Sequence, residues 1–223
     1  MKTKTKLIIL ISVLSVCIVA TATGFTVAYW MGADGTNQIA PQTDTTDWNY
    51  WTKYLIYEEV KNSQGNVIGY KAVDFEGAVL ENIIIPRFAK GGKVRHDDGT
   101  MTEITSANAP VLIVGNTLFA DTTDKMIPVT LTLPTTVDVE AGAFAGLTNL
   151  TKITIKQVKS HAGNTNDDDI KIGLNAFFGC DNVKQFVAAE NIAITVPGAS
   201  TSTFDDFKVA TGLSNDDLVR SNG

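Results

Sequence analysis

Two histidines, His96 and His161, are the side chains of this sequence best suited to acid–base chemistry or metal binding near neutral pH. Neither has a companion at the spacing of a metal site. His96 opens the segment His-Asp-Asp-Gly, and because Asp-Gly favours a turn, we expect a loop there. The sequence also lacks a glycine-rich phosphate loop and a nucleophile elbow with Ser, His and Asp in order. It therefore predicts no catalytic residue, no cofactor and no enzymatic activity.

Oxygen-bearing side chains gather at residues 164–169, which read Asn-Thr-Asn-Asp-Asp-Asp. Carboxylate and amide oxygens are the ligands that Ca²⁺ prefers. The segment lacks the glycine at the sixth place and the terminal glutamate of a calcium-binding hand loop. We expect a solvated acidic loop and no metal site, with calcium binding as the alternative.

The clearest pattern is a segment that occurs twice, at residues 137–153 and 170–186. Each copy begins with alternating aliphatic residues, which are typical of a short strand, and continues with Ala-Phe-x-Gly and an asparagine. Residues 159–169 interrupt the pattern, and without them the repeat is about 23 residues long. Such a unit buries its apolar face only by stacking on its own copies. The expected repeat-core residues are Val137, Val139, Ala143, Phe144, Gly146, Asn149, Leu150, Ile170, Ile172, Ala176, Phe177, Gly179, Asn182 and Val183.

Each repeated residue type has a physical role. The two phenylalanines fill the space between a strand and its return segment, at about 1.5–3 kcal/mol of transfer free energy each. Gly146 and Gly179 suit a tight turn with positive φ. Asn149 and Asn182 can hydrogen-bond to the backbone of a loop. These roles predict turns stacked on one another.

Fainter copies flank the two clear ones. Upstream, residues 111–120 carry an apolar strand and a turn in which Leu118 takes the place of the aromatic. Downstream, residues 202–213 fit a degenerate closing copy. Several apolar strands end at a proline, which stops pairing because it has no amide hydrogen. These prolines are Pro86, Pro134 and Pro197.

The motif Ala-Phe-x-Gly-Leu-x-Asn-Leu-x-x-Ile at 143–153, its copy at 176–186 and the strand-ending prolines resemble the BspA-like subclass of leucine-rich repeats, common in bacterial surface proteins. The resemblance covers roughly residues 70–210 and is most specific over 129–187. It implies a β-rich leucine-rich-repeat solenoid with short strands and helical or irregular return segments. The insertion at 159–169 and the missing proline after Ile155 depart from the pattern and leave the number of coils open.

The first 31 residues predict export. Three lysines precede an apolar run from Leu7 to Met31, which we expect to form one hydrophobic helix. Ala20-Thr21-Ala22 fits a signal-peptidase site, whereas the aromatic pair before Met31 fits the interfacial belt of a retained anchor. Lipidation at Cys17 is a third possibility. All three place the body outside the cytoplasm, either secreted or anchored at the cell surface.

Composition restricts the partners. Aspartate and glutamate outnumber lysine and arginine by 24 to 18, and the formal net charge is −6. An acidic body repels phosphate backbones, so we expect no nucleic acid partner. With Cys17 in the leader and Cys180 in a repeat, we expect no disulfide within a mature chain.

An aromatic cluster lies between the leader and the repeats. Trp48, Tyr50, Trp51 and Tyr54 form either a contact patch for a partner or a cap on the first coil. A hairpin follows, with strand-forming residues on both sides of a Gly/Asn turn at 61–66. We expect this hairpin to close the N-terminal end of the stack.

The chain therefore divides into segments with distinct roles. They are a signal peptide or membrane anchor (1–31), a polar linker (32–47), a capping hairpin (48–80), the solenoid (81–213) and a polar tail (214–223). With the resemblance, this organisation predicts an exported, non-catalytic surface protein that binds a protein or glycan partner. It contacts the membrane only if the leader is retained. The alternative is a structural subunit of an extracellular matrix or envelope layer, built by polymerisation through open ends of the stack.

Overall fold

The computed structural model describes residues 51–76, 81–120, 127–159 and 166–222, together with the backbone of four short strands before them. Two compact units are present, Met1–Thr46 and Asp47–Gly223. The described part of the larger unit is rich in β-strand and contains little helix.

The smaller unit contains two antiparallel strand pairs, β1 with β2 and β3 with β4. These strands are β1 (Ala20–Ala22), β2 (Phe25–Val27), β3 (Tyr29–Met31) and β4 (Asn37–Ile39). The sequence predicted one hydrophobic helix over this run, but its described part consists of strands. Threonine, valine and aromatic residues there favour extended backbone. Residues 1–19, including Cys17, lie outside the described residues.

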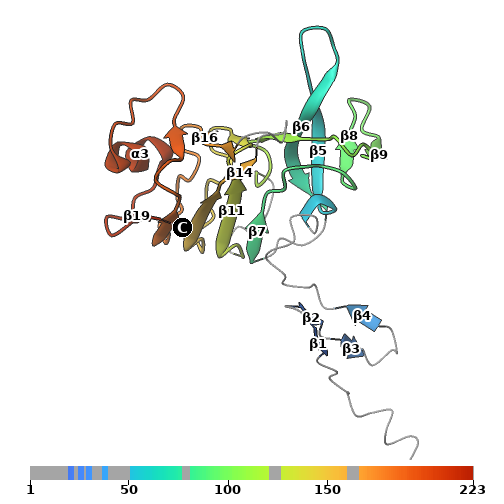
Figure 1. The fold of residues 1–223 in the computed structure, drawn as a ribbon, viewed down its shortest axis with the longest axis horizontal. Helices are drawn as coiled ribbons and strands as arrows, with labels where there is room; N and C mark the ends of the chain where they lie inside the picture. Colours follow the sequence, from blue (N-terminus) through green and yellow to red (C-terminus); the bar gives the residue numbers. More distant parts are fainter. Residues whose placement is uncertain are drawn as a thin grey trace, which may run out of the picture. The chain divides into compact units, whose positions relative to one another are not determined.

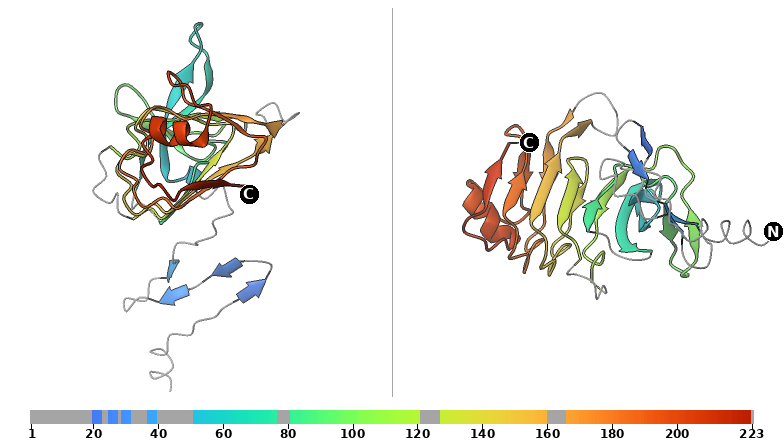
Figure 2. Two further views of the ribbon diagram at one scale, coloured as in Figure 1. Left: turned by 90° about the vertical axis from the view of Figure 1, so that its left-hand side faces the viewer. Right: turned by 90° about the horizontal axis from the view of Figure 1, so that it is seen from below.

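The larger unit contains a five-stranded parallel sheet of order β19-β17-β13-β11-β7. Chain order and sheet order agree, so each strand lies beside the next one along the chain (Figures 1 and 2). Its strands are β7 (Asn82–Ile84), β11 (Thr130–Pro134), β13 (Lys152–Lys156), β17 (Gln185–Val187) and β19 (Val219–Ser221). The register places Leu131, Ile153 and Phe186 in one row, and all three side chains are buried.

A second sheet has the order β12-β10-β6-β5-β8-β9. Its strands are β5 (Leu55–Lys61), β6 (Val67–Phe75), β8 (Lys93–Arg95), β9 (Met101–Glu103), β10 (Val111–Val114) and β12 (Asp138–Val139). A bridge between Val139 and Ile172 continues it to β16 (Asp169–Lys171), which pairs with β18 (Ala193–Thr195). The parallel strands β6, β10, β12, β16 and β18 therefore also follow chain order.

Turns between the two sheets hydrogen-bond to one another. Phe144 N donates to Ala176 O at 2.9 Å, and Gly146 N donates to Phe178 O at 2.7 Å. The predicted positive φ is present at both glycines of the repeat, at 82° for Gly146 and 76° for Gly179. Equivalent turns thus stack with paired main-chain groups.

A row of aromatic rings fills the space inside the turns. The rings of Trp51 and Phe75 lie 6.2 Å apart, and Phe75 and Phe119 lie 4.9 Å apart. Phe119 and Phe144 follow at 5.8 Å, and Phe144 and Phe177 at 5.6 Å with an interplanar angle of 9°. Edge-on, tilted and stacked ring contacts at these distances add to the free energy of burial.

The third ring of the row belongs to Phe119, whereas the sequence pattern assigned its place to Leu118. Three main-chain amides each donate to a carbonyl group of the preceding coil, so their residues hold equivalent positions in the repeat. These residues are Gly115, Glu140 and Gly173. The fourth residue after each of them is a phenylalanine, which puts Phe119 in the row. Leu118 is buried one position earlier. Because Leu118 and Phe119 are adjacent and both apolar, the alignment of this copy with the clear repeats was ambiguous by one residue.

The asparagines of the repeat also contact neighbouring turns. Asn182 Nδ2 donates to Thr148 O at 2.6 Å, as the sequence predicted. Asn215 Nδ2 donates to Val183 O at 2.9 Å and extends the arrangement by one turn. Each amide therefore satisfies a carbonyl group of the preceding turn.

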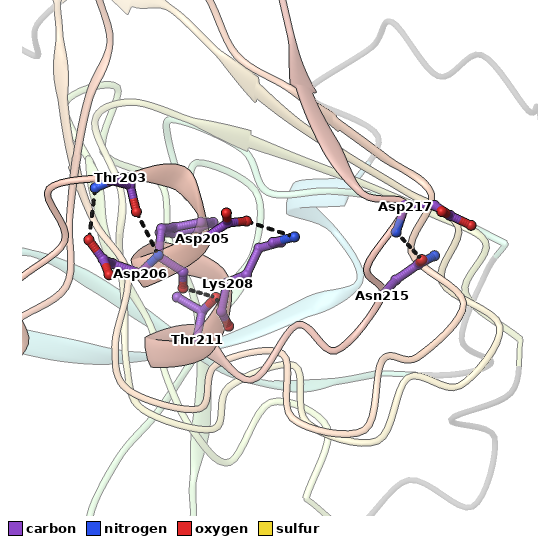
Figure 3. Close-up of polar contacts among 8 residues, drawn as sticks. Thr203, Asp205, Asp206, Lys208, Thr211, Asn215 and Asp217 are labelled. Atoms are coloured by element: carbon purple, nitrogen blue, oxygen red, sulfur yellow. Dashed lines mark hydrogen bonds and ion pairs between the residues drawn. The ribbon is translucent and has the colours of Figure 1, made fainter.

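Helix α3 (Phe204–Thr211) covers the last coil. In its capping box, Thr203 Oγ1 accepts from Asp206 N at 3.1 Å and Thr203 N donates to Asp206 Oδ2 at 3.0 Å (Figure 3). A hydrogen bond from Ser202, followed by those from Thr203, lowers the pKa of the Asp206 carboxyl. The helix ends at Gly212, whose φ is 80°.

The carbonyl groups at the end of α3 accept from the preceding turn. Asn175 N donates to Ala210 O at 2.9 Å, and Phe177 N donates to Thr211 O at 2.8 Å. The last carbonyls of a helix have no partner within it. The helix therefore takes the place of a further turn.

Residues 214–222 differ from the polar tail that the sequence analysis assigned to 214–223. Leu218 is buried, and Val219–Ser221 form β19, which pairs in parallel with β17. The strand was missed because the polar run Ser214-Asn215-Asp216-Asp217 precedes it and resembles part of a tail. These polar residues form a turn. Asp217 N, for example, donates to Asn215 Oδ1 (Figure 3).

Arg220 occupies the core-facing row of the five-stranded sheet, where the preceding strand carries Phe186. Its guanidinium donates to Ala189 O at 2.6 Å and Ile192 O at 3.0 Å. An inward-pointing charge on an edge strand discourages pairing with another chain. The inward-pointing guanidinium therefore discourages further strand pairing at the C-terminal edge of the sheet.

The β5–β6 hairpin lies at the other end of the parallel strands, at the positions where the sequence analysis expected a hairpin. Its tip projects beyond the rest of the larger unit (Figure 1). Asn62 Oδ1 accepts from the amides of Gln64 and Asn66, which fixes the tip. At its base, Tyr57 is completely buried, and the close approach of Gly92 leaves no room for a side chain there.

Replacing Tyr57 by phenylalanine is expected to raise the free energy of unfolding by about 1 kcal/mol, because an unsatisfied buried hydroxyl is costly. The Tyr57 hydroxyl has no hydrogen-bond partner among the described residues. Burial also raises its pKa, so the phenol stays neutral. Urea denaturation of both proteins measures the change. A loss of stability in the phenylalanine variant would show that the hydroxyl has a partner.

Cys180 is expected to be unreactive in the folded protein. Its side chain is buried, its Sγ donates to Phe144 O at 3.2 Å, and burial raises the pKa of the thiol to about 12. The thiolate is the reactive form, so labelling at pH 8 should be about 100-fold slower than in urea. The measurement uses a Cys17→Ser variant and a chromogenic disulfide reagent. Equal rates with and without urea would contradict the burial.

Candidate binding groove

A concavity lies on the outer face of the second sheet, beside the segment that interrupts the repeat. This segment forms the antiparallel pair β14 (Val158–Lys159) and β15 (Asn166–Asp167). The sequence predicted an insertion over 159–169, and the paired strands explain how it leaves the repeat. Insertions in repeat proteins often lie on the binding face.

The concavity has a volume of about 420 Å³, which is within the range of small-molecule sites. We call it the hairpin groove, after the adjacent β14–β15 strand pair. It is lined by Leu112, Ile113, Thr135, Thr136, Asp138, Asp169 and Lys171.

A β-bulge supplies the apolar part of the groove. The pairing of β10 with β6 shifts between Val111 and Ile113, which leaves Leu112 as the extra residue. Bulges change the direction of side chains. Leu112 lies over Gly69, where an added Cβ would be 2.5 Å from Leu112 Cδ1. Leu112 and Ile113 are both half-buried, so this part of the groove is apolar but accessible.

Charged side chains form the part of the groove next to Ile113, which pairs in register with Asp138. Lys171 Nζ lies 3.2 Å from Asp138 Oδ2, and Lys171 N donates to Asp138 Oδ1 at 3.2 Å. The two residues are on neighbouring strands, β12 and β16, thirty-three positions apart. Both side chains are accessible, and pairs of this kind contribute little to stability. They remain available to a ligand.

Two threonines form the end of the groove next to the inserted strands. Thr135 N donates to Lys156 O, and Thr135 Oγ1 accepts from Val158 N at 3.2 Å. Thr136 is only 8 % exposed, and its Oγ1 has no hydrogen-bond partner among the described residues. The inserted segment therefore holds Thr135, whereas the Thr136 hydroxyl has no partner within the described part of the chain.

The described residues of the groove offer several kinds of binding group. Asp138 is engaged by Lys171, and none of the seven lining residues is a histidine or a cysteine. Within the described part of the chain, no three His, Cys, Asp or Glu residues are placed to hold a metal ion. The arrangement offers carboxylates, an ammonium group, hydroxyls and an aliphatic surface.

The residues singled out by sequence lie elsewhere. Trp51 is 3 % exposed and packs on Phe75, which favours the capping role over the contact patch, whereas Tyr54 is 37 % exposed. Trp48 and Tyr50 lie outside the described residues. Of the two aromatics that the structure describes, Tyr54 is accessible and Trp51 is not.

The described residues of the two polar segments considered first lie at the surface. His96 Nε2 lies 2.8 Å from Thr102 Oγ1 in the turn between β8 and β9, as expected for a loop. Asp168 Oδ1, at the end of the acidic segment, accepts from Gln157 Nε2 and Asn191 Nδ2. His161 and residues 164–165 lie outside the described residues.

The groove residues were not identified from sequence as a site. The signal in the sequence was the interruption of the repeat between 159 and 169, which contains Asp169 and is followed by Lys171. Asp138 and the two threonines lie more than twenty residues upstream of it. Nothing in the sequence placed Leu112 beside them, since the bulge in β10 has no distinctive residue pattern.

None of the described residues belongs to a helix that is both long enough and apolar enough to cross a bilayer.

No protein family matches the sequence, and no curated protein does. Among solved structures, the chain is similar to a leucine-rich cell surface protein from Faecalibacterium prausnitzii, with 16% sequence identity and a TM-score of 0.36. The similarity covers 74% of this chain and 48% of that protein, so this chain spans about half of its length.

Proposed function

We propose that this chain is an exported, non-catalytic surface protein that folds as a short leucine-rich-repeat solenoid and binds a partner through the hairpin groove. The observation that carries the proposal is a concavity of about 420 Å³ where an inserted strand pair leaves a stacked repeat. The apolar and charged groups that line it are accessible, as a contact surface requires.

The stacked arrangement supports the solenoid. Two sets of parallel strands follow chain order, and turns between them pair through main-chain hydrogen bonds. The aromatic row passes through successive coils. Each unit contacts its neighbours, which is the organisation of a repeat protein.

The C-terminal end favours binding over polymerisation. Arg220 points inward on the edge strand β19, and α3 takes the place of a further turn at the C-terminal end. A structural subunit that grew by end-to-end stacking would need open strand edges. The alternative, a matrix or envelope subunit, therefore has less support.

Export rests on the sequence of the leader, whose basic end and apolar run are those of an exported chain. The acidic composition favours a neutral or basic partner over a nucleic acid.

The test is binding of the full chain to an array of purified extracellular glycans and proteins. We expect at least one partner of the wild-type chain to be lost by a double variant, Asp138→Asn with Lys171→Gln. The control variant is Lys61→Gln, which changes an accessible lysine on the β5–β6 hairpin. Turnover of any partner, or binding that the groove variant leaves unchanged, would contradict the proposal.

A further inference from the structure

We propose that the outer edge of β9 pairs with the same edge of a second copy of this chain, antiparallel and about a two-fold axis at Thr102. This inference goes beyond the proposed function. β9 lies at the opposite end of the second sheet from β12, which contributes Asp138 to the hairpin groove (Figure 1).

The outer side of β9 carries main-chain groups that point away from the sheet. Within the described part of the chain, β8 is the only strand that pairs with β9. Thr100 O and Ile104 N, at the two ends of β9, hydrogen-bond to residues that flank β8 at 2.9 and 2.8 Å. Because the direction alternates along an antiparallel strand, Thr102 also points its main chain toward β8, whereas Met101 and Glu103 point theirs outward.

β9 lacks the devices that protect the C-terminal edge strand. Natural sheets blunt an edge with a proline, a bulge or an inward-pointing charge, and β19 does so with Arg220. β9 contains no proline, and its pairing with β8 has no register shift. All three residues of β9 are exposed. This edge can therefore accept a further strand through main-chain hydrogen bonds.

The register about Thr102 uses every outward-pointing group. It aligns Met101 of each copy with Glu103 of the other, and each such pair exchanges two hydrogen bonds, so the interface forms four. Pairing centred on Glu103 would oppose two carboxylates, which is destabilising. Pairing centred on Met101 would place Glu103 opposite the turn at Gly99. The Thr102 register opposes no like charges.

A concavity of about 500 Å³ beside β9 supplies complementary charge. It is lined by Lys53, Glu76, Gly91, Lys93, Met101 and Glu103. Lys93 Nζ contacts both carboxylate oxygens of Glu76 at 2.6 Å, so these two charges compensate each other.

The remaining two charges of the concavity favour a second copy as the occupant. Lys53 and Glu103 have no ion-pair partner among the described residues. In the two-fold pair, Glu103 of the second copy lies opposite Met101, beside the concavity that contains Lys53. The uncompensated cation of each copy thus meets the uncompensated carboxylate of the other.

The interface is small and closed. Three residues a side bury little area, so we expect a transient dimer. A two-fold interface uses the same surface on both copies and does not propagate into a polymer. The dimer would carry two hairpin grooves, and a multivalent partner would be held by both.

The first experiment is sedimentation equilibrium of the full chain from about 1 µM to about 1 mM. We expect a monomer–dimer equilibrium with a Kd on the order of 100 µM and no larger species. Glu103→Pro removes an outward-pointing amide and should weaken the dimer at least about tenfold relative to Glu103→Gln. The glutamine variant is the matched control, because it removes the same charge and keeps the amide.

The second experiment tests the register by cross-linking in the Cys17→Ser background. Two copies of Thr102→Cys would meet on the axis with Cα atoms about 4.5 Å apart, within the range of a disulfide. Two copies of Thr100→Cys, an exposed position just before β9, would be more than about 13 Å apart. Under mild oxidation, Thr102→Cys should form dimers at least about tenfold faster.

Two controls make these results specific. The groove double variant, Asp138→Asn with Lys171→Gln, should dimerise as the wild type does. Circular dichroism and thermal melting of each variant establish that it is folded. Thr102→Cys changes only an exposed side chain, so the cross-linking test stands even if Glu103→Pro is unstable.

The inference is overturned if the chain stays monomeric at about 1 mM, or if folded Glu103→Pro dimerises as well as Glu103→Gln. Equal cross-linking of Thr100→Cys and Thr102→Cys would also overturn it, as would open-ended oligomers. A monomer that instead binds an extended peptide at β9 would refute the second copy as the occupant. None of these outcomes bears on the hairpin groove, which the groove variant tests separately.

Discussion

Replacing Phe177 by alanine is expected to lower the free energy of unfolding by about 3–5 kcal/mol, as large-to-small changes in a core do. The ring is completely buried and stacks on Phe144 at 5.6 Å, so its removal leaves a cavity between two coils. Urea denaturation followed by circular dichroism measures the loss. We expect a similar loss for Phe144→Ala, because its ring contacts Phe119 on one side and Phe177 on the other.

The adjacent residue is a matched control. Phe178 is 65 % exposed, so Phe178→Ala removes the same atoms from a solvated position and should cost less than about 1 kcal/mol. If Phe177→Ala were no more destabilising than Phe178→Ala, the aromatic row would not contribute to the core.

The second large effect is expected for Gly173→Ala. A Cβ at this position would lie 2.3 Å from Ala141 N and 2.5 Å from Glu140 C, both main-chain atoms of the neighbouring coil. Neither coil can move without breaking hydrogen bonds such as Gly173 N to Val139 O at 2.8 Å. We expect a loss of about 3 kcal/mol or more in the free energy of unfolding, at the upper end of the range for overpacking.

Gly142→Ala separates close packing from backbone conformation. Gly142 has a φ of 71° and open space where a Cβ would lie, so alanine there should cost about 1–2 kcal/mol through conformation alone. Thermal and urea unfolding of both variants provide the comparison. A Gly173→Ala protein as stable as Gly142→Ala would mean that the coils are not in main-chain contact.

The repeat could be predicted from sequence because its key residues recur at a constant spacing. Phe144 and Phe177 hold the same position in successive turns, and the rings stack as the duplicated pattern implies. The glycines after them carry the positive φ that their type suggested. A repeated sequence fixes such features, because the same contacts recur in every coil.

The irregular coils were harder to predict. Gly212-Leu213-x-Asn215 repeats Gly146-Leu147-x-Asn149, yet Ala210 replaces the aromatic, which concealed this copy. Phe204 and Phe207 instead supply rings that pack on Phe186 from α3. The aromatic rings of the last coil therefore come from α3, several residues before the position that the repeat pattern predicts.

The groove could not be predicted because its parts come from unrelated segments. A bulge brings Leu112 to the surface, and the inserted strands hold Thr135. The bulge and the position of the inserted strands both depend on the register of strand pairing. The residue types of these segments do not determine that register.

The hydrogen bonds that end at α3 also limit how short a stable fragment of the protein can be. Ala210 and Thr211 accept the amides of Asn175 and Phe177. A chain truncated before residue 210 would leave these two donors without acceptors at the new terminus. Truncated variants should therefore lose residues from the N-terminal side or complete internal coils.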